Sequence, residues 1–325
     1  MDTLEILKLI PVGKDYLWGG TRLREEYNKK IELTPLAETW ECSVHPDGPS
    51  IVANGSYRGK SLSWVLEQHP EYLGTKMKEV KQLPVLVKFI DAKQDLSIQV
   101  HPDDTYARLH ENDNGKTEMW YVMDAKEDAH IIYGFTHPVT KALLQEGIQS
   151  GTLDKHLQKV RVKKGDVIYV PAGMVHGIGT GVLIAEIQES SNVTYRVYDY
   201  NRVDKDGKQR ELHFDKATEV MDMSVAKDIK PEERMVHYYP GSSRETLSQC
   251  KYFVTEKIQI KTGCSFSVME NSFQILLCID GDGQIEMADG SGKTMRFRKG
   301  ECMFLPAGLG RCFVLGDATL LKVRC

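Results

Sequence analysis

The amino-acid sequence predicts a mainly β protein built from two related barrels, with a few helices inserted around them. Three observations support this prediction. The apolar segments are short and rich in β-branched and aromatic residues, turn-forming residues separate them, and one strand-and-turn pattern occurs twice. Many short strands bounded by such turns are typical of a β-sandwich or a β-barrel.

The expected strands are apolar runs bounded by glycine, proline, asparagine or aspartate. The clearest of them are residues 84–90, 119–123, 130–135, 166–170 and 182–187. Helical patterns are fewer, and each has near its start a residue that suits a helix N-terminus. They cover residues 61–69, 103–112 and 136–151. We expect these helices to lie outside the β framework.

The repeated pattern occupies residues 164–176 (KGDVIYVPAGMVH) and residues 299–311 (KGECMFLPAGLGR). Lysine, glycine, proline, alanine and glycine coincide, and the apolar stretch between them is in register. A repeat of this kind indicates a duplicated structural unit. The last position differs, because it is His176 in the first copy and Arg311 in the second. Only the first copy therefore keeps a side chain that can bind a metal ion.

This difference predicts how the chain is divided. We expect a catalytic barrel with helical insertions over residues 1–240 and a second, metal-free barrel over residues 241–325. The polar stretch at residues 227–246 is the expected linker or crossover between the two.

The composition is that of an ordinary globular protein, with 41% hydrophobic and 27% charged residues. The formal net charge of −4 gives no sign of the basic patch that nucleic-acid binding needs. The sequence has no run of about eighteen apolar residues and no signal-peptide pattern, so we expect neither a membrane span nor secretion. Seven cysteines without a C-x-x-C pair favour reduced thiols and a cytoplasmic location.

Four polar side chains are candidates for a metal site. Within residues 96–104, Gln99 and His101 point to the same face of the expected strand, because side chains alternate along a strand. Glu118 begins the next strand, and His176 follows the turn PAGMV. Two imidazoles, one carboxylate and one amide oxygen suit a borderline divalent ion. Each residue taken alone is more often packed or solvated without a metal, so the prediction depends on the set.

The spacing around these residues strengthens the set. Residues 165–176 follow the pattern G-x5-P-x-G-x2-H, which resembles the second cupin motif. Gln99, His101 and Glu118 resemble the first cupin motif, with glutamine in place of the usual first histidine. The resemblance implies cupin (jelly-roll) barrels, of which the first holds the metal ion.

The resemblance then narrows to one family. The runs LSIQVHPD (96–103), KTEMWY (116–121), PAGMVH (171–176) and NVTYRVYDYNR (192–202) together resemble type I mannose-6-phosphate isomerase, most of all its short bacterial form. This resemblance implies one zinc ion per chain, although other divalent metals suit the same ligands. The implied ligands are Gln99, His101, Glu118 and His176.

The same resemblance implies roles for residues around the metal ion. Arg196 and Lys116 are the implied catalytic residues, and Lys88 and Ser97 are implied substrate-binding residues. Trp18, which precedes two glycines, is the best aromatic candidate for a sugar pocket.

The sequence departs from the family pattern at two places near the implied base. Larger family members have a histidine before the catalytic lysine and an aspartate shortly before the arginine. This chain has Gly115 and, at roughly the second place, Asn192. The general base is therefore open, and Lys116 is a candidate for it.

The implied reaction is the aldose–ketose isomerisation between mannose 6-phosphate and fructose 6-phosphate through a metal-stabilised enediolate. Two alternatives stay open at this point. Another cupin metalloenzyme, acting on a different sugar phosphate or using iron for oxygen chemistry, would share the two-histidine, one-carboxylate core. A non-catalytic sugar-binding cupin would also keep the framework. The expected partner is a phosphorylated hexose, without nucleic acid or membrane, and the chain is expected to be a monomer or a homodimer.

Overall fold

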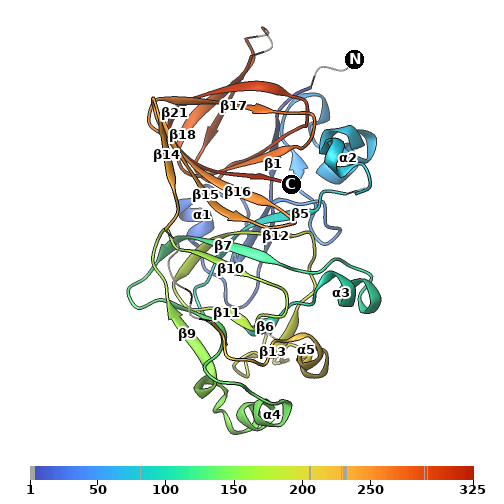
Figure 1. Cartoon of the computed structure of the whole chain (residues 1–325), viewed down its shortest axis with the longest axis vertical. Helices are drawn as coiled ribbons and strands as arrows, with labels where there is room; N and C mark the ends of the chain where they lie inside the picture. Colours follow the sequence, from blue (N-terminus) through green and yellow to red (C-terminus); the bar gives the residue numbers. More distant parts are fainter. Residues whose placement is uncertain are drawn as a thin grey trace.

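The computed structural model describes residues 4–80, 82–204, 206–227, 229, 233–288, 290 and 292–325. The strands in these ranges form three sheets of ten, six and five strands, and the helices lie at the periphery (Figure 1). The predicted mainly β architecture is confirmed, although the strands are organised as stacked sheets rather than as closed barrels.

The six-stranded sheet is the middle layer of the molecule, and its strand order is β10-β7-β12-β5-β3-β2. These strands are Val167–Val170, Glu118–Ala125, Val182–Glu189, Val85–Asp91, Glu38–Cys42 and Val12–Lys14. All residues of β3, β5 and β12 are buried, because the sheet is covered on both faces. Burial on both faces explains why β5 and β12 appear in the sequence as nearly continuous apolar runs.

The five-stranded sheet packs on one face of the middle layer, and its order is β13-β6-β11-β8-β9. These strands are Tyr195–Tyr198, Ile98–Val100, His176–Ile178, His130–Phe135 and Leu157–Arg161. An apolar cluster that includes Ile90, Val122, Ile131 and Ile178 fills part of the space between the two sheets.

The ten-stranded sheet covers the other face of the middle layer. Its main path is β14-β15-β16-β21-β18-β20-β1-β4, with β17 on β21 and β19 on β18. These strands are Val236–Tyr239, Ser242–Gln249, Val254–Ile260, Gly310–Arg324, Gln274–Met287, Cys302–Leu305, Leu7–Ile10, Ile51–Val52, Gly263–Val268 and Thr294–Arg298.

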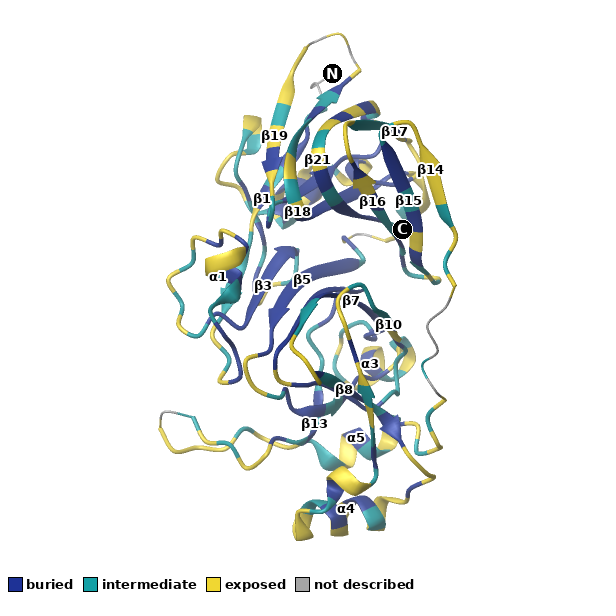
Figure 2. Ribbon diagram, turned by 90° about the vertical axis from the view of Figure 1, so that its left-hand side faces the viewer, coloured by how far each residue is buried: buried dark blue, intermediate teal, exposed yellow. Residues whose placement is uncertain are grey.

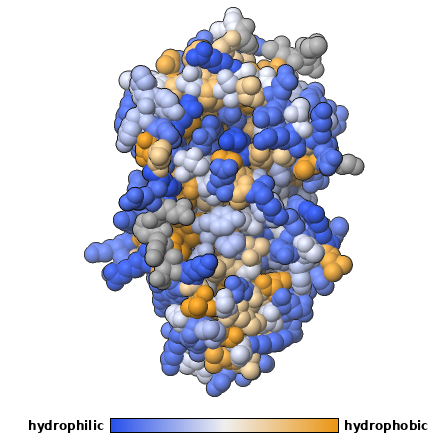
Figure 3. Space-filling model, in the orientation of Figure 1, coloured by the Kyte–Doolittle hydropathy of each residue, from blue (hydrophilic) through white to orange (hydrophobic). Residues whose placement is uncertain are grey.

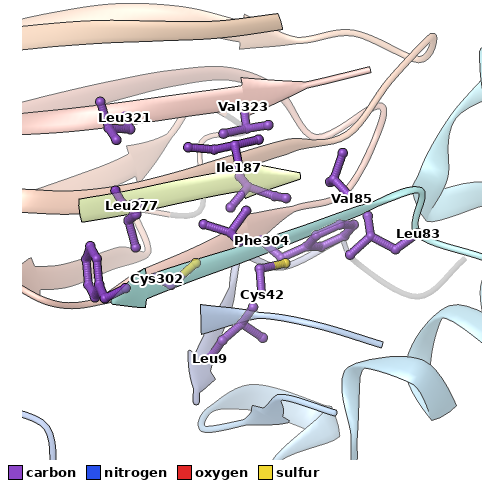
Figure 4. Close-up of a cluster of buried hydrophobic side chains, with 14 of the residues drawn as sticks. Leu9, Cys42, Leu83, Val85, Ile187, Leu277, Cys302, Phe304, Leu321 and Val323 are labelled. Atoms are coloured by element: carbon purple, nitrogen blue, oxygen red, sulfur yellow. The ribbon is translucent and has the colours of Figure 1, made fainter. Parts of the chain in front are cut away.

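One apolar cluster joins the ten-stranded sheet to the middle layer. Figure 4 shows Val85 and Ile187 of the middle layer beside Leu277, Phe304 and Val323 of the ten-stranded sheet. Each fully buried side chain of this size contributes about 1.5–3 kcal/mol by leaving water. In Figure 2 the strands at this contact are coloured as buried, whereas exposed residues concentrate on the helices and outer loops.

The three expected helices are confirmed, each with a side-chain cap at its N-terminus. They are α2 (Leu62–Gln68), α3 (Asp104–His110) and α4 (Lys141–Ser150). The side chain of each cap residue accepts a hydrogen bond from a backbone N–H group in the first turn of its helix. The cap residues are Ser61, Asp103 and Thr140. Two further short helices, α1 (Arg22–Glu26) and α5 (Phe214–Val220), were not expected from the sequence.

The two copies of the repeat have the same local structure. In the first, β10 leads through a turn to β11, and in the second, β20 leads through a turn to β21. The turn glycines, Gly173 and Gly308, have φ angles of 85° and 80°, a conformation that strongly favours glycine. This requirement explains why glycine occupies the same position in both copies of the repeat.

The expected linker at 227–246 is only partly described, since residues 228 and 230–232 lie outside the described residues. Its second half is not a linker, because β14 and the beginning of β15 form a hairpin there. Strand β14 is mostly exposed at the sheet edge, so it has no apolar alternation that would reveal it. The division at residue 240 stays a prediction. The N-terminal strand β1 crosses that division, because it pairs with β20 in the ten-stranded sheet.

Candidate active site

The candidate site lies between the five-stranded and six-stranded sheets. On the five-stranded sheet, Arg196, Gln99 and His176 occupy directly paired positions on the adjacent strands β13, β6 and β11. Directly paired residues of antiparallel strands project from the same face of a sheet. The register of three strands therefore brings together side chains that are far apart in the sequence.

The six-stranded sheet contributes a second row that faces the first. Trp120, Glu186, Lys88 and Trp40 are directly paired across β7, β12, β5 and β3. Glu118 lies two residues before Trp120 on β7 and therefore shares its face. The two rows place imidazoles and carboxylates on opposite walls of one interior space.

Both histidines are oriented by backbone carbonyl groups. Nδ1 of His101 donates to the carbonyl of Val193 at 2.9 Å, and Nδ1 of His176 donates to the carbonyl of Met174 at 2.8 Å. These bonds leave each Nε2 as an unprotonated acceptor, which is the arrangement of a metal-binding imidazole. The Nε2 atoms of His101 and His176 lie 3.6 and 3.3 Å from the carboxylate oxygens of Glu118.

The carboxylate of Glu118 is the strongest indication of a bound cation. Its side chain is fully buried, and Nζ of Lys116 lies 2.8 Å from one of its oxygens, whereas the other oxygen lies 3.3 Å from Nε2 of His176 and accepts no hydrogen bond. A buried carboxylate oxygen that accepts no hydrogen bond and faces an unprotonated imidazole nitrogen is unfavourable unless a cation lies between the two. The ligand atoms of His101, Glu118 and His176 all lie within 4.8 Å of one another. The residues present therefore fit a divalent metal ion.

The electrostatics of the three side chains agree with this interpretation. Burial, assisted by the nearby carboxylate of Glu186, raises the pKa of Glu118 above its ordinary value. Burial lowers the pKa of His176 to about 4 and lowers that of His101 as well, so both imidazoles are neutral at pH 7. Neutral imidazoles are the form that binds metal ions, and a bound cation would favour the ionised form of Glu118.

Gln99 lies at the edge of this cluster. Its side-chain nitrogen is 3.4 Å from Nε2 of His176, and its oxygen accepts a hydrogen bond from Ser97 at 3.4 Å. The end of the Gln99 side chain thus lies beside the cluster formed by His101, Glu118 and His176. Exchange of its amide oxygen and nitrogen would turn the oxygen toward the other ligands, and we keep Gln99 as a proposed fourth ligand.

A cavity of about 220 Å³ opens beside the cluster. Six of the residues expected in the site line it: Trp18, Lys88, Ser97, Gln99, Lys116 and Arg196. Lys116 connects it to two further candidate ligands, because its Nζ lies 2.9 Å from Nε2 of His101 and 2.8 Å from Glu118. The structure therefore brings the expected site residues together around one space.

Lys88 has a more internal position than a surface lysine. Its Nζ lies 3.6 Å from Glu38 and 3.4 Å from Glu186, and only 5% of its side chain is exposed. Burial alone would lower the pKa of Lys88, but the two carboxylates outweigh burial and raise it. Lys88 therefore stays protonated and holds two acidic side chains at the cavity wall.

Sequence reasoning missed several residues that line the cavity. Glu186 interrupts the apolar run at 182–187, and an acidic residue in a strand buried on both faces was an available signal. Trp120 Nε1 donates to one oxygen of Glu186 at 2.9 Å, whereas the other oxygen is buried without a hydrogen bond. Arg210 also lines the cavity, but nothing in its local sequence indicates this.

Comparison with known proteins gives two family matches. Residues 6–128 match the catalytic domain of type I phosphomannose isomerase, and residues 243–325 match the cupin domain of mannose-6-phosphate isomerase. The chain is 41% identical to mannose-6-phosphate isomerase ManA of Bacillus subtilis, over 97% of this chain and 98% of that protein. The chain belongs to the type I mannose-6-phosphate isomerase family. The Streptococcus mutans member is 37% identical over 89% of both chains.

Solved structures of the mannose-6-phosphate isomerase family have the same fold. The crystal structure of the Bacillus subtilis enzyme has a TM-score of 0.89 and 38% identity, covering 98% of this chain and 99% of that one. A phosphomannose isomerase variant from Salmonella typhimurium has a TM-score of 0.76 at 16% identity, covering 98% of both chains, and shows likeness of fold alone. The cupin fold predicted from the motifs is thereby confirmed.

Two further observations concern the surface of the molecule and the character of its helices. The face drawn in Figure 3 is mostly hydrophilic, with hydrophobic residues scattered over it. Among the helices of the described ranges, none combines the length and the apolar character that crossing a membrane would require.

Proposed function

We propose that this chain interconverts mannose 6-phosphate and fructose 6-phosphate as a metal-dependent isomerase. The observation that carries the proposal is the fully buried carboxylate of Glu118, which faces two imidazoles with unprotonated Nε2 atoms and has one oxygen that accepts no hydrogen bond. This cluster adjoins a cavity lined by Lys116 and Arg196, in a chain of the mannose-6-phosphate isomerase family. Family membership favours the isomerase over an iron oxygenase or a non-catalytic sugar-binding protein.

The proposed ligands of the metal ion are Gln99, His101, Glu118 and His176. We take the ion to be zinc, one per chain, because nitrogen and oxygen ligands of this kind suit a borderline divalent ion. One carboxylate among four ligands leaves a 2+ ion with residual positive charge. When bound, such an ion supplies Lewis-acid polarisation of the sugar's carbonyl oxygen.

The isomerisation requires a group that removes a proton beside the carbonyl and returns it to the neighbouring carbon. Two side chains that line the cavity, Lys116 and Glu186, are the candidates that we propose for this role. Burial alone would raise the pKa of Glu186, but Lys116, Lys88 and the hydrogen bond from Trp120 lower it below the ordinary value. Glu186 is therefore ionised and can accept a proton at the oxygen that Trp120 does not bond, which lies 3.4 Å from Nζ of Lys88, and Lys116 stays the second candidate.

The remaining cavity residues bind and orient the sugar phosphate. Arg196 offers a planar set of donors for the phosphate group, and Ser97 can donate a hydrogen bond. Lys88 holds the carboxylates of Glu38 and Glu186 at the wall, where they can accept hydrogen bonds from sugar hydroxyl groups. Trp18 provides an apolar surface for the sugar ring.

The location and the oligomeric state are also proposals. A cytoplasmic location agrees with the seven free cysteines. The chain acts as a monomer or a homodimer, because one chain supplies every proposed site residue.

The deciding experiment is a coupled assay of mannose 6-phosphate isomerisation, with the metal content measured on the same sample. Chelation should abolish turnover, and readdition of zinc should restore it. A fully metal-loaded protein that leaves mannose 6-phosphate unchanged would refute the proposed function.

A further inference from the structure

Beyond the expected site residues, Arg210 brings a second guanidinium group to the cavity. The metal-binding side chains are almost completely buried at one end, where Lys116 and Lys88 also have only 5% of their side chains exposed. Arg196 and Arg210 line the same cavity, and 23% of the Arg210 side chain is exposed. The two arginines therefore mark the end of the cavity that is nearer to solvent.

The fold places Arg210 beside Arg196 through backbone pairing. The backbone N–H of His213 donates to the carbonyl of Arg196 at 2.7 Å, and Nδ1 of His213 accepts from the Arg196 N–H at 3.2 Å. The side chain of Arg196 also donates to the carbonyl of Glu211 at 2.7 Å. The segment that carries Arg210 is thus fixed along β13, although the two arginines are separated by a loop.

Asp199 fixes the orientation of the Arg210 guanidinium. Nε and Nη2 of Arg210 donate to the two oxygens of Asp199 at 2.7 and 2.6 Å. This bidentate geometry holds one edge of the planar group and leaves Nη1 available to another acceptor. Only 5% of the Asp199 side chain is exposed, so the ion pair is better shielded from solvent than a surface pair.

The charges around this end of the cavity favour an anion. Asp199 also pairs with Arg202, so one carboxylate compensates two guanidinium groups. Within the described ranges no carboxylate forms an ion pair with Arg196, and its Nε is buried without a hydrogen bond. Burial, followed by repulsion from Arg210, lowers the pKa of Arg196. A ligand with several anionic oxygens would relieve this repulsion and supply the missing acceptor.

We propose that Arg210, oriented by Asp199, binds the phosphate group of the substrate together with Arg196. The proposal rests on the proposed function and deepens it by naming a further specificity-determining residue. Two guanidinium groups suit the tetrahedral oxygens of a phosphate monoester better than the neutral hydroxyl groups of a sugar. The sugar then extends from the arginines toward the metal-binding end.

The test is calorimetric titration of the zinc-loaded protein with mannose 6-phosphate, inorganic phosphate and mannose. Arg210→Gln should weaken binding of both phosphate-containing probes by roughly tenfold to a hundredfold, which corresponds to loss of a charged hydrogen bond. Binding of mannose should change by less than about twofold, because mannose has no phosphate group. The matched control is Arg161→Gln, which removes the same charge from a side chain that is 84% exposed, and it should leave all three affinities unchanged.

A second variant separates recognition from a purely structural role. Arg210→Lys keeps the charge and can still pair with Asp199, but it loses the planar set of donors. It should fold with unchanged metal content and bind mannose 6-phosphate with an affinity between those of the wild type and Arg210→Gln. Wild-type phosphate binding in Arg210→Gln, or equal losses for mannose and mannose 6-phosphate, would overturn the proposal.

The same titrations distinguish failure of the two proposals. If the wild type binds mannose 6-phosphate through Arg210 but does not convert it, the proposed function fails and the assignment of Arg210 stands. If Arg210→Gln retains full affinity and the wild type is an active isomerase, only the assignment of Arg210 fails.

Discussion

Replacement of Glu118 by glutamine tests the metal site directly. Glutamine has nearly the same shape, so the buried position should be filled without a cavity. It lacks the carboxylate, which carries the only negative charge in the proposed ligand set. The two carboxylate oxygens of Glu118 lie 3.3 and 3.6 Å from the Nε2 atoms of His176 and His101. We therefore expect Glu118→Gln to lower the metal affinity and the isomerase activity, and to lower the stability of the metal-free protein because Lys116 loses its buried counter-charge.

The size of the effect follows from binding linkage. A metal ion at a free concentration about 1,000-fold above its dissociation constant stabilises the folded protein by about 4 kcal/mol. Such a gain raises the melting temperature by roughly 6 °C for a cooperatively unfolding chain of 325 residues. Loss of a residue that only hydrogen-bonds to a metal ligand lowers metal affinity by about 10- to 100-fold. Loss of the anionic ligand itself should therefore lower metal affinity by at least about 100-fold. The variant would then retain only about 1.4 kcal/mol of the stabilisation.

The assay is thermal unfolding with and without added zinc, together with measurement of bound metal. Glu186→Gln is the matched control, since Glu186 is buried in the same cavity but pairs with Lys88 instead of the imidazoles. This control should keep the full metal-dependent gain in melting temperature. An equal gain in Glu118→Gln and the wild type would refute the assignment of Glu118 as a ligand.

Three further perturbations test other parts of the site. His176→Ala should abolish both metal binding and turnover while circular dichroism still reports a folded β protein; retained stoichiometric metal would contradict its role. Lys88→Met should destabilise the fold by about 3–5 kcal/mol in denaturant unfolding, because Glu38 and Glu186 would lose their buried counter-charge, and a change below about 1 kcal/mol would argue against this pairing. Burial raises the pKa of Glu189 from 4.5 to about 7, so stability should fall by up to about 3 kcal/mol as the pH rises between these values, and Glu189→Gln should flatten that fall.

Features that repeat along the chain were predictable from the sequence. The five expected strands all occur, because each is a short apolar run bounded by turn residues. The shared face of Gln99 and His101 followed from strand alternation, and the divergence between His176 and Arg311 distinguished the two copies of the repeat.

Features that depend on register between distant strands were not predictable from the sequence. Glu186 enters the site because β12 pairs with both β5 and β7, which aligns it with Lys88 and Trp120. Arg210 reaches the cavity because its segment pairs with β13, a contact that no local pattern encodes. Single-sequence periodicity specifies which face a side chain takes, but it does not specify which neighbouring strand lies beside it.

The ten-stranded sheet supports the cavity through the middle layer. Along β5 and β12, Val87 and Ile187 face the ten-stranded sheet, whereas their neighbours Lys88 and Glu186 face the cavity. A shift of one residue in either strand would exchange these faces and remove the charged side chains from the site. Packing of Val87 and Ile187 against residues such as Phe304 opposes that shift, since it would bury charges in an apolar core. The ten-stranded sheet can therefore contribute none of the proposed metal ligands and still hold Lys88 and Glu186 in register at the cavity.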